Sequence, residues 1–452
     1  MISLLGFLIT VGILVTFHEL GHYGVARWYG VKVLRFSFGF GPVLISRRFG
    51  RDQTEWALSA VPLGGYVRML DERDRRDDEE PIAEGDLPRA FNRQSVWKRF
   101  AIVAAGPLAN LLLAVLLLAA MYMVGVSGYQ PVLSQPAAGT PAAMAGLQSL
   151  DRVVAVNERP VTVWQDVNRQ LLSAGITSSA VLTIERGSSS FKAPLAMAAM
   201  AKDDGEGPPL ERLGLHLYLG APLIREVSAD SPAAAAGLQP GDRIQAIDGI
   251  TLDTPSAMTA RLNRAAGTTV ELTVMRHGAT LTLPVTPRQE TAASGKAVGR
   301  IGVVLTGDPE VGERYRVTVR HGAVDALVLG ITRTWDLTAL SFKMIGRMII
   351  GSASLKNLAG PLTIADYAGQ SIQAGFQQFI TYLALISIGL GVLNLLPVPL
   401  LDGGHLLYYF AEIIRGRALP ERVIEIGQRI GLALIITLIV LALLNDFSRL
   451  LF

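Results

Sequence analysis

The sequence predicts a polytopic α-helical membrane protein with four transmembrane helices, a membrane-associated β-hairpin or small sheet, and two α+β modules outside the membrane. Three observations predict this fold class: an apolar composition, four long apolar segments and an internal repeat. Of the 452 residues, 50% are hydrophobic and only 17% are charged, whereas soluble domains carry about 25% charge. The composition therefore argues against a wholly soluble protein and against a disordered chain.

Charge and cysteine content exclude several classes of function. The formal net charge is +3, from 41 basic and 38 acidic residues. This near balance lacks the basic surplus of a nucleic-acid-binding domain, so no nucleic-acid partner is expected. The chain contains no cysteine, which excludes disulfides, thiolate metal ligands and a cysteine nucleophile.

Four segments have the roughly 20 apolar residues that a membrane-spanning helix needs. They are residues 2–26, 100–126, 379–414 and 430–444. The first segment has no basic region before its apolar stretch and contains three ionisable residues, so it does not read as a secretory signal peptide. The third is interrupted by glycine and proline.

Basic residues are clustered in the short flanks on one side of the spans, and the positive-inside rule places that side in the cytoplasm. They follow the first span, precede the second, and separate the third from the fourth. These residues are Arg27, Lys32, Arg35, Arg93, Lys98, Arg99, Arg415, Arg417 and Arg422. We therefore expect both termini and the long 127–378 segment on the opposite side. The mixed-charge run at 71–80 is expected to be a solvated loop.

Residues 140–161 and 231–252 are two copies of one pattern. Pro-Ala-Ala, Ala-Gly-Leu-Gln and Asp-Arg elements recur in the same register, and a strand-like stretch follows each. The pattern resembles tandem PDZ domains of the bacterial type, which bind extended peptides by adding a strand to a sheet edge. The first copy has Ser149-Leu150 where the second has Pro240-Gly241, so its turn and groove are expected to differ. In the alternative interpretation, both modules are spacers without a peptide ligand.

The repeat and the spans together predict five regions. These are an N-terminal membrane part (1–126), a first PDZ domain (127–220), a second PDZ domain (221–310), an amphipathic region (311–378) and a C-terminal membrane part (379–452). The amphipathic region, with a helical stretch at 326–350, is expected either to lie on the outer membrane face or to be a packed linker. His216, His277 and His321 lie outside the spans and are expected to be ordinary surface residues.

The first span contains the pattern H-E-x-x-H, formed by His18, Glu19 and His22. On a helix, positions i and i+4 share one face, so both imidazoles can bind one metal ion. Glu19 then lies beside the metal, where it can take a proton from water. Each ionisable group inside an apolar span costs a few kcal/mol, so the pattern is far more informative here than in a soluble helix. The alternative is a polar contact between helices.

A catalytic zinc site needs a third protein ligand and one open position. The third span offers two eligible residues, Asp402 and His405. Two prolines and two glycines are expected to unwind this span near Asp402. Unwound backbone at membrane depth is tolerated only where protein or a water-filled cavity covers it, as a hydrolytic site requires.

H-E-x-x-H in the first span and N-x-x-P-x-P-x-L-D-G in the third together resemble the site-2 protease family of intramembrane zinc metalloproteases. The resemblance covers essentially the whole chain. It implies one Zn²⁺ held by His18, His22 and Asp402, with Glu19 as the catalytic base. It also implies that Asn394, Pro397 and Pro399 position the substrate. His405, one turn beyond Asp402, is then a packing or supporting residue.

Residues 31–70 are expected to form a hairpin-like sheet, with a turn at Gly39–Pro42 and a second glycine-rich stretch at Gly64-Gly65. The resemblance implies that this sheet dips to the membrane and pairs with an extended substrate; an ordinary cytoplasmic hairpin is the alternative. Asn110, in the second span, is expected either to handle substrate or to pack helices.

The resemblance implies a multi-pass protease of the bacterial inner membrane, with periplasmic termini and PDZ domains. Its substrate would be a single-span membrane protein already shortened outside, such as a membrane-bound anti-sigma factor in an envelope-stress cascade, with remnant signal peptides as further substrates. The PDZ pair would exclude substrates whose outer domain is intact. A non-catalytic scaffold and a transporter are the rival functions, but Glu19 has no use in the first and helix repeats are absent for the second.

Overall fold

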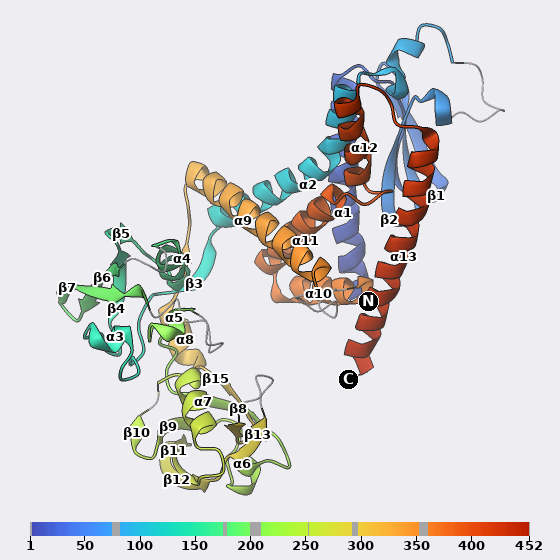
Figure 1. Ribbon diagram of the computed structural model, residues 1–452. Coiled ribbons are helices and arrows are strands. Elements are labelled where there is room, and N and C mark those ends of the chain that lie inside the picture. Colours follow the sequence, from blue (N-terminus) through green and yellow to red (C-terminus); the bar gives the residue numbers. More distant parts are fainter. Residues whose placement is uncertain are drawn as a thin grey trace. The chain divides into compact units, whose positions relative to one another are not determined.

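The computed structural model describes residues 2–74, 82–174, 179–198, 209–251, 253–291, 297–351 and 360–451. The chain forms two compact units. The membrane unit comprises Met1–Gly125 and Arg320–Phe452, and the outer unit comprises Val126–Val319. The chain therefore leaves the membrane unit once and returns to it (Figure 1).

Within the described residues, four helices are long and apolar enough to cross a membrane, as predicted. They are α1 (Ile2–Trp28), α2 (Val96–Val124), α11 (Phe376–Leu395) and α13 (Glu421–Leu451). The third predicted span is divided: α11 ends at Leu395, and α12 (Asp402–Arg415) is a separate helix. Proline lacks an N–H and disfavours helical backbone in the residue before it, which explains a break at Leu396–Leu401.

Small residues let the helices of the membrane unit approach closely. A Cβ added at Gly21 of α1 would lie 2.3 Å from the Ala105 carbonyl oxygen of α2. Two further helices, α9 (Ala323–Ile349) and α10 (Pro361–Ala374), cover this bundle. The predicted helical stretch at 326–350 is α9, which packs on α2 at Gly330 and leaves Trp335 exposed. Close backbone approach through small residues is the usual way that helices associate in lipid.

The predicted hairpin is present as β1 (Val33–Phe49) and β2 (Thr54–Met69). The two strands pair antiparallel with repeated register shifts, so that Phe36 lies opposite both Trp56 and Val67. Each strand must therefore bend back on itself. The predicted turn at Gly39–Pro42 lies inside β1, where two glycines have positive φ. The hairpin thus forms a doubled-back sheet instead of a simple ribbon.

The loop between β1 and β2 is tied to the rest of the membrane unit through Asp52. Its carboxylate accepts hydrogen bonds from Arg27, at the end of α1, and from Arg89. The hydrogen bonds from Arg89 lower the pKa of Asp52, which keeps it charged. Three short 3₁₀ helices connect the sheet to α2: η1 (Glu72–Asp74), η2 (Leu87–Arg89) and η3 (Phe91–Arg93). Most of the predicted solvated loop at 71–80, namely residues 75–80, lies outside the described residues.

The two halves of the outer unit each have their own core and share one plan. The Pro-Ala-Ala element itself begins a short helix, and farther along the chain a longer helix comes between two strands of the sheet. The first half contains β3 (Val126–Tyr129), α3 (Pro141–Met144), β4 (Arg152–Val156), β5 (Arg159–Pro160), α4 (Trp164–Ala174), β6 (Ser179–Arg186), β7 (Ser189–Ala196) and α5 (Pro209–Arg212).

The second half is longer at its end. It contains β8 (Leu223–Val227), α6 (Pro232–Ala235), β9 (Arg243–Ile247), β10 (Ile250–Thr251), α7 (Pro255–Arg264), β11 (Val270–Arg276), β12 (Ala279–Val285), β13 (Arg288–Thr291), β14 (Ala297–Arg300), β15 (Val303–Thr306), α8 (Pro309–Tyr315) and β16 (Arg316–Val319). β16 pairs with β3, so the unit's first and last strands lie side by side.

The predicted repeat corresponds to one repeated structure. The order β5-β4-β6-β7 in the first sheet matches β10, β9, β11 and β12 in the second. In the first half, the buried Asp151 accepts hydrogen bonds from Arg186. In the second, Asp242 accepts them from Arg276. Burial alone would raise the pKa of Asp242, but these bonds lower it overall.

The expectation that the turn of the first copy differs is wrong for the backbone: Leu150 has φ 69° where Gly241 has φ 93°, so both turns are left-handed at this position. The departure changes a contact instead, because Ser149 donates a hydrogen bond to Asp253 of the second half at 2.9 Å. The prediction that His216 is an ordinary surface residue is wrong: it is half-buried, and its Nδ1 lies 3.4 Å from Ser256 Oγ. The contacts of Ser149 with Asp253 and of His216 with Ser256 therefore link the two halves.

Candidate metal centre

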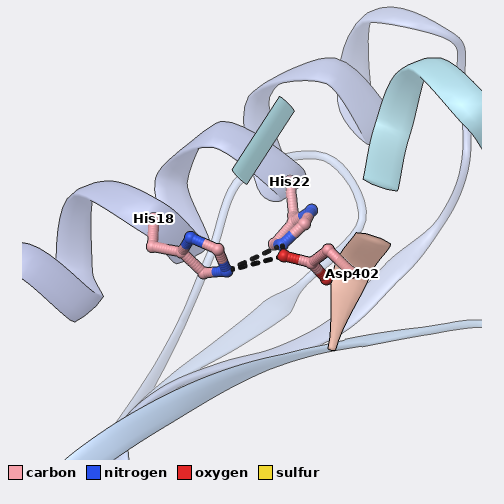
Figure 2. Close-up of side chains that lie close together, drawn as sticks. All are labelled: His18, His22 and Asp402. Atoms are coloured by element: carbon pink, nitrogen blue, oxygen red, sulfur yellow. Dashed lines mark hydrogen bonds and ion pairs between the residues drawn. The ribbon is translucent and has the colours of Figure 1, made fainter. Parts of the chain in front are cut away.

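His18, His22 and Asp402 come together in the membrane unit, although the aspartate lies more than 370 positions from the histidines. His18 and His22 project from one face of α1 toward Asp402, the first residue of α12 (Figure 2). The two histidine Nε2 atoms are 3.2 Å apart. Asp402 Oδ2 lies 3.1 Å from Nε2 of His18 and 3.5 Å from Nε2 of His22.

These three separations fit a tetrahedral zinc ion. Zinc bonds of about 2.0–2.1 Å at tetrahedral angles place neighbouring ligand atoms roughly 3.3 Å apart. Asp402 Oδ2 is buried and faces both imidazole Nε2 atoms at these distances. Two imidazoles and one carboxylate are also the donor set of several catalytic zinc sites, and three protein ligands leave one position for water or substrate.

The histidines are held by α2. His22 Nδ1 lies 2.9 Å from the carbonyl oxygen of Ile102, and His18 Nδ1 lies 3.3 Å from the Asn110 side chain. A Cβ at Gly106 would lie only 2.2 Å from His22 Nε2 and 2.9 Å from His18 Cε1. Sequence reasoning missed Ile102 and Gly106. A glycine beside Pro107 in an apolar helix was the available signal for the second, whereas a backbone carbonyl leaves no signal.

Asp402 reaches the histidines because the break before α12 is tightly folded. Leu400 has φ 84°, a left-handed conformation that is costly for leucine. Cβ atoms at Gly403 and Gly404 would lie 2.1 Å from the Leu396 carbonyl oxygen and 2.5 Å from the Val398 carbonyl oxygen. The two glycines therefore let the break pack against the first turn of α12.

The sequence alone left Asp402 and His405 as alternatives, and the geometry selects Asp402. The group of potential ligand atoms contains His18, His22 and Asp402. The His405 ring instead packs edge-on against Tyr408, with centroids 6.3 Å apart. His405 is not among the atoms of that group, and its packing or supporting role stays a prediction.

Glu19 faces a cavity of about 380 Å³ between α1 and the sheet. Thr16 and Phe17 of α1 line it on one side, and Phe36–Gly39 of β1 line it on another. Gly64 is also part of the lining, and a Cβ at Gly65 would lie 3.2 Å from Glu19 Cγ. Gly65 therefore lies beside Glu19, and Gly64 lines the same cavity.

The other predicted substrate residues lie at the α11–α12 break. Asn394 is half-buried in the last turn of α11, and Pro397 is exposed. Pro399 packs against α13, because a Cβ at Gly431 would lie 2.2 Å from its carbonyl oxygen. None of these three residues is among those that line the Glu19 cavity. Their role toward substrate stays a prediction.

Comparison with known proteins gives a match over nearly the whole chain. The profile described as "Peptidase family M50" matches residues 6–438. The chain belongs to peptidase family M50. This membership confirms the predicted site-2 protease family and makes the chain a metalloendopeptidase of the membrane.

Three relatives align over their full length. A putative zinc metalloprotease of Ralstonia nicotianae is 42% identical over 100% of this M50 peptidase and 99% of the relative. The regulators of sigma-E protease of Salmonella typhimurium and Escherichia coli are 38% and 37% identical, each over 99% of both chains. The PDZ domain of an SdrC-like protein from Listeria monocytogenes covers 20% of this chain and 92% of its own, at 23% identity and a TM-score of 0.17.

Proposed function

We propose that this M50 peptidase is a zinc-dependent intramembrane endopeptidase that cuts single-span membrane proteins within the bilayer. One observation carries the proposal. Two histidines and an aspartate converge between apolar helices at separations that suit zinc, and Glu19 lies beside them on a cavity. Three ionisable ligands and a fourth ionisable group, the Glu19 carboxylate, are costly inside a membrane unit unless they serve a site.

In this proposal His18, His22 and Asp402 hold one zinc ion per chain. When bound, the ion supplies Lewis-acid chemistry: it polarises the scissile carbonyl and makes water more acidic. Glu19 takes the proton from the attacking water and delivers it to the leaving amine nitrogen. The Val67 backbone of β2 lies beside the Glu19 carboxylate and would help to orient the base. The remaining apolar lining excludes bulk water from the reacting bond.

The sheet beside Glu19 suits an extended substrate. A helical peptide bond is shielded by its own hydrogen bonds, so the substrate must unwind before it is cut. Residues 65–69 of β2 pair with β1 on one side, and Gly65 brings this stretch close to Glu19. An unwound substrate segment can pair with such an edge. Gly64 and Gly65 lie at the start of the stretch that would bind the substrate, and Asn394, Pro397 and Pro399 would border the other side of the site.

The substrate class follows from the relatives that regulate sigma-E. We propose a single-span anti-sigma factor, cleaved first on the outer side by another protease, as the substrate in an envelope-stress response, with remnant signal peptides as further substrates. The enzyme would lie in the bacterial inner membrane. Identity of 37–38% over nearly the whole length supports this transfer of function.

The direct test is cleavage of a single-span reporter by purified protein in proteoliposomes. Wild type is expected to cut it, whereas Glu19→Gln is expected to lose at least about 100-fold in rate, since it removes general-base catalysis. Glu19→Gln must keep its zinc, because Glu19 is not a proposed ligand. Equal cleavage by the two proteins would exclude the proposed protease mechanism. A scaffold or a transporter would leave the reporter uncut by both proteins.

The outer unit would act as a filter for substrate size, built from two PDZ-like modules at 127–220 and 221–310. The second module is better suited to hold a peptide, because β15 forms an end of its sheet and pairs with β8 only. The corresponding part of the first module makes the isolated bridge Leu133–Leu217. Removal of residues 127–318 is expected to permit cleavage of a substrate with an intact outer domain. Continued rejection of that substrate would contradict the filter.

The proposed orientation has both termini and the outer unit in the periplasm. Trp28 and Trp97, which are 81% and 65% exposed, lie at the end of α1 and the start of α2. Tryptophan collects at membrane interfaces, and the basic residues around this pair support a cytoplasmic position for it. Because the chain has no cysteine, single cysteines can be introduced and labelled with an impermeant maleimide. Cysteines at Ser190 and Ser448 should react from outside, and one at Gln94 should not.

A further inference from the structure

Asn110 of α2 contacts the outer nitrogen of one proposed zinc ligand. Its side chain is fully buried, and its Nδ2 lies 3.3 Å from His18 Nδ1. Its backbone carbonyl accepts a hydrogen bond from Ser387 Oγ of α11 at 2.7 Å. Its Oδ1 is buried without a hydrogen-bond partner in the described chain.

The direction of the Asn110–His18 hydrogen bond decides whether His18 can bind a metal. If Nδ2 donates to Nδ1, the proton of the neutral ring must lie on Nε2. Nε2 is the atom that points toward Asp402 Oδ2, 3.1 Å away, and a protonated nitrogen has no lone pair for a metal. Rotation of the Asn110 carboxamide by half a revolution exchanges Oδ1 and Nδ2, and this reverses the direction of the hydrogen bond. Oδ1 then accepts the Nδ1–H bond, and Nδ2 instead of Oδ1 faces the position without a protein partner.

His22 shows the same arrangement without ambiguity. Its Nδ1 faces the Ile102 carbonyl oxygen at 2.9 Å, and a carbonyl can only accept. The His22 proton therefore lies on Nδ1, which leaves Nε2 free. Ligating histidines commonly donate their second N–H to a carbonyl or carboxylate, which fixes the tautomer and the ring orientation. Only His18 relies on a group that can act as either donor or acceptor.

We infer that Asn110 is a positioning residue whose Oδ1 accepts the His18 Nδ1–H bond and directs His18 Nε2 to the metal. This inference rests on the proposed function, because it assumes that His18 binds zinc. It assigns Asn110 a role distinct from both sequence expectations, substrate handling and helix packing. The Ser387 hydrogen bond fixes the backbone at Asn110, so the contact depends on the carboxamide alone.

The test is the affinity for Zn²⁺ of full-length, untagged protein in detergent, measured by competition with a chromophoric chelator. Asn110→Leu has a similar volume but no acceptor, and we expect zinc to bind about 10- to 100-fold more weakly. Asn110→Asp can only accept when ionised and is expected to bind zinc within about threefold of wild type. The Co²⁺ d–d spectrum of Asn110→Asp should match that of wild type.

Each result separates the roles. Unchanged zinc affinity in Asn110→Leu overturns the inference: with lost cleavage it assigns Asn110 to substrate, and with lower thermal stability alone it assigns Asn110 to packing. If Asn110→Leu does not fold, weakening of zinc by more than tenfold in Asn110→Asp also overturns it. His18→Ala keeps the two proposals apart. If that variant binds zinc like wild type, the proposed metal site fails; if it loses zinc, a failure concerns Asn110 alone.

Discussion

The two sides of the candidate metal centre are built differently. The histidine side belongs to one uninterrupted helix, α1, and its geometry follows from a spacing of four residues. The aspartate side begins a new helix after a break, and its position depends on how Leu396–Leu401 folds against Gly403 and Gly404. One side is therefore fixed by local periodicity, and the other by contacts that bring separate helices together.

The largest effect is expected on the histidine side, from Gly106→Ala. The new Cβ would lie 2.2 Å from His22 Nε2, so the ring or α2 must move. We expect at least about a 100-fold loss of zinc affinity, beyond the range for supporting residues, and loss of cleavage. Gly24→Ala is the matched control, because nothing lies within 4 Å of its added Cβ. Zinc binding by Gly106→Ala at the wild-type level would show that α2 does not enclose the histidines in this way.

Gly403→Ala tests the aspartate side. Its Cβ would lie 2.1 Å from the Leu396 carbonyl oxygen, a backbone atom that cannot rotate away. Displacement of Asp402 should weaken zinc binding about 10- to 100-fold, as measured by chelator competition. Gly389→Ala in α11, with open space around the added Cβ, should bind zinc normally. If both variants behave alike, the packed break does not position Asp402.

A smaller effect is expected where the two sides are joined, at Arg99 and Glu412. Arg99 Nη2 of α2 lies 2.6 Å from Glu412 Oε1 of α12, and both side chains are largely buried. Removal of one partner leaves the other charge unpaired, so Arg99→Leu should weaken zinc binding about 10-fold and lower the melting temperature. The double variant Arg99→Leu with Glu412→Leu should recover part of the melting temperature. No recovery would mean that the ion pair does not join the helices.

The smallest effect is expected at Leu400, inside the break. A left-handed leucine costs about 1–2 kcal/mol, and glycine adopts this conformation freely. Leu400→Gly should therefore change the free energy of unfolding by at most about 1 kcal/mol in the stabilising direction, since its side chain is 43% exposed. Zinc affinity should stay unchanged. Strong destabilisation, measured by thermal unfolding in detergent, would show that the leucine side chain itself holds the break.

The same difference explains how much of the molecule could be predicted. Apolar length predicted the four spans, and helical periodicity predicted that His18 and His22 share a face. The repeat predicted two similar halves, but the expectation that the turn at Ser149-Leu150 differs was wrong for the backbone. Local patterns could not show the contact between Ser149 and Asp253, because it joins residues 104 positions apart.

At the site, chemistry alone could not choose between Asp402 and His405. Which of the two meets the histidines depends on the packing of α12 against α2, which no local pattern encodes. The Ile102 carbonyl oxygen is equally invisible in a sequence, because every residue has one. Gly106 was visible as a residue, but its role depends on the close approach of α1 and α2. The residues that carry chemistry could be predicted, whereas those that place them required the structure.

The central claim is that His18, His22 and Asp402 hold one zinc ion and that Glu19, next to it, is the general base. The most direct measurement is the zinc content of untagged, purified protein by mass spectrometry, for wild type, Glu19→Gln, His18→Ala, His22→Ala and Asp402→Ala. We expect about one zinc per chain in wild type and Glu19→Gln, and less than about a tenth of that in the other three, since each removes a direct ligand. A full equivalent of zinc in any of those three variants would contradict the account.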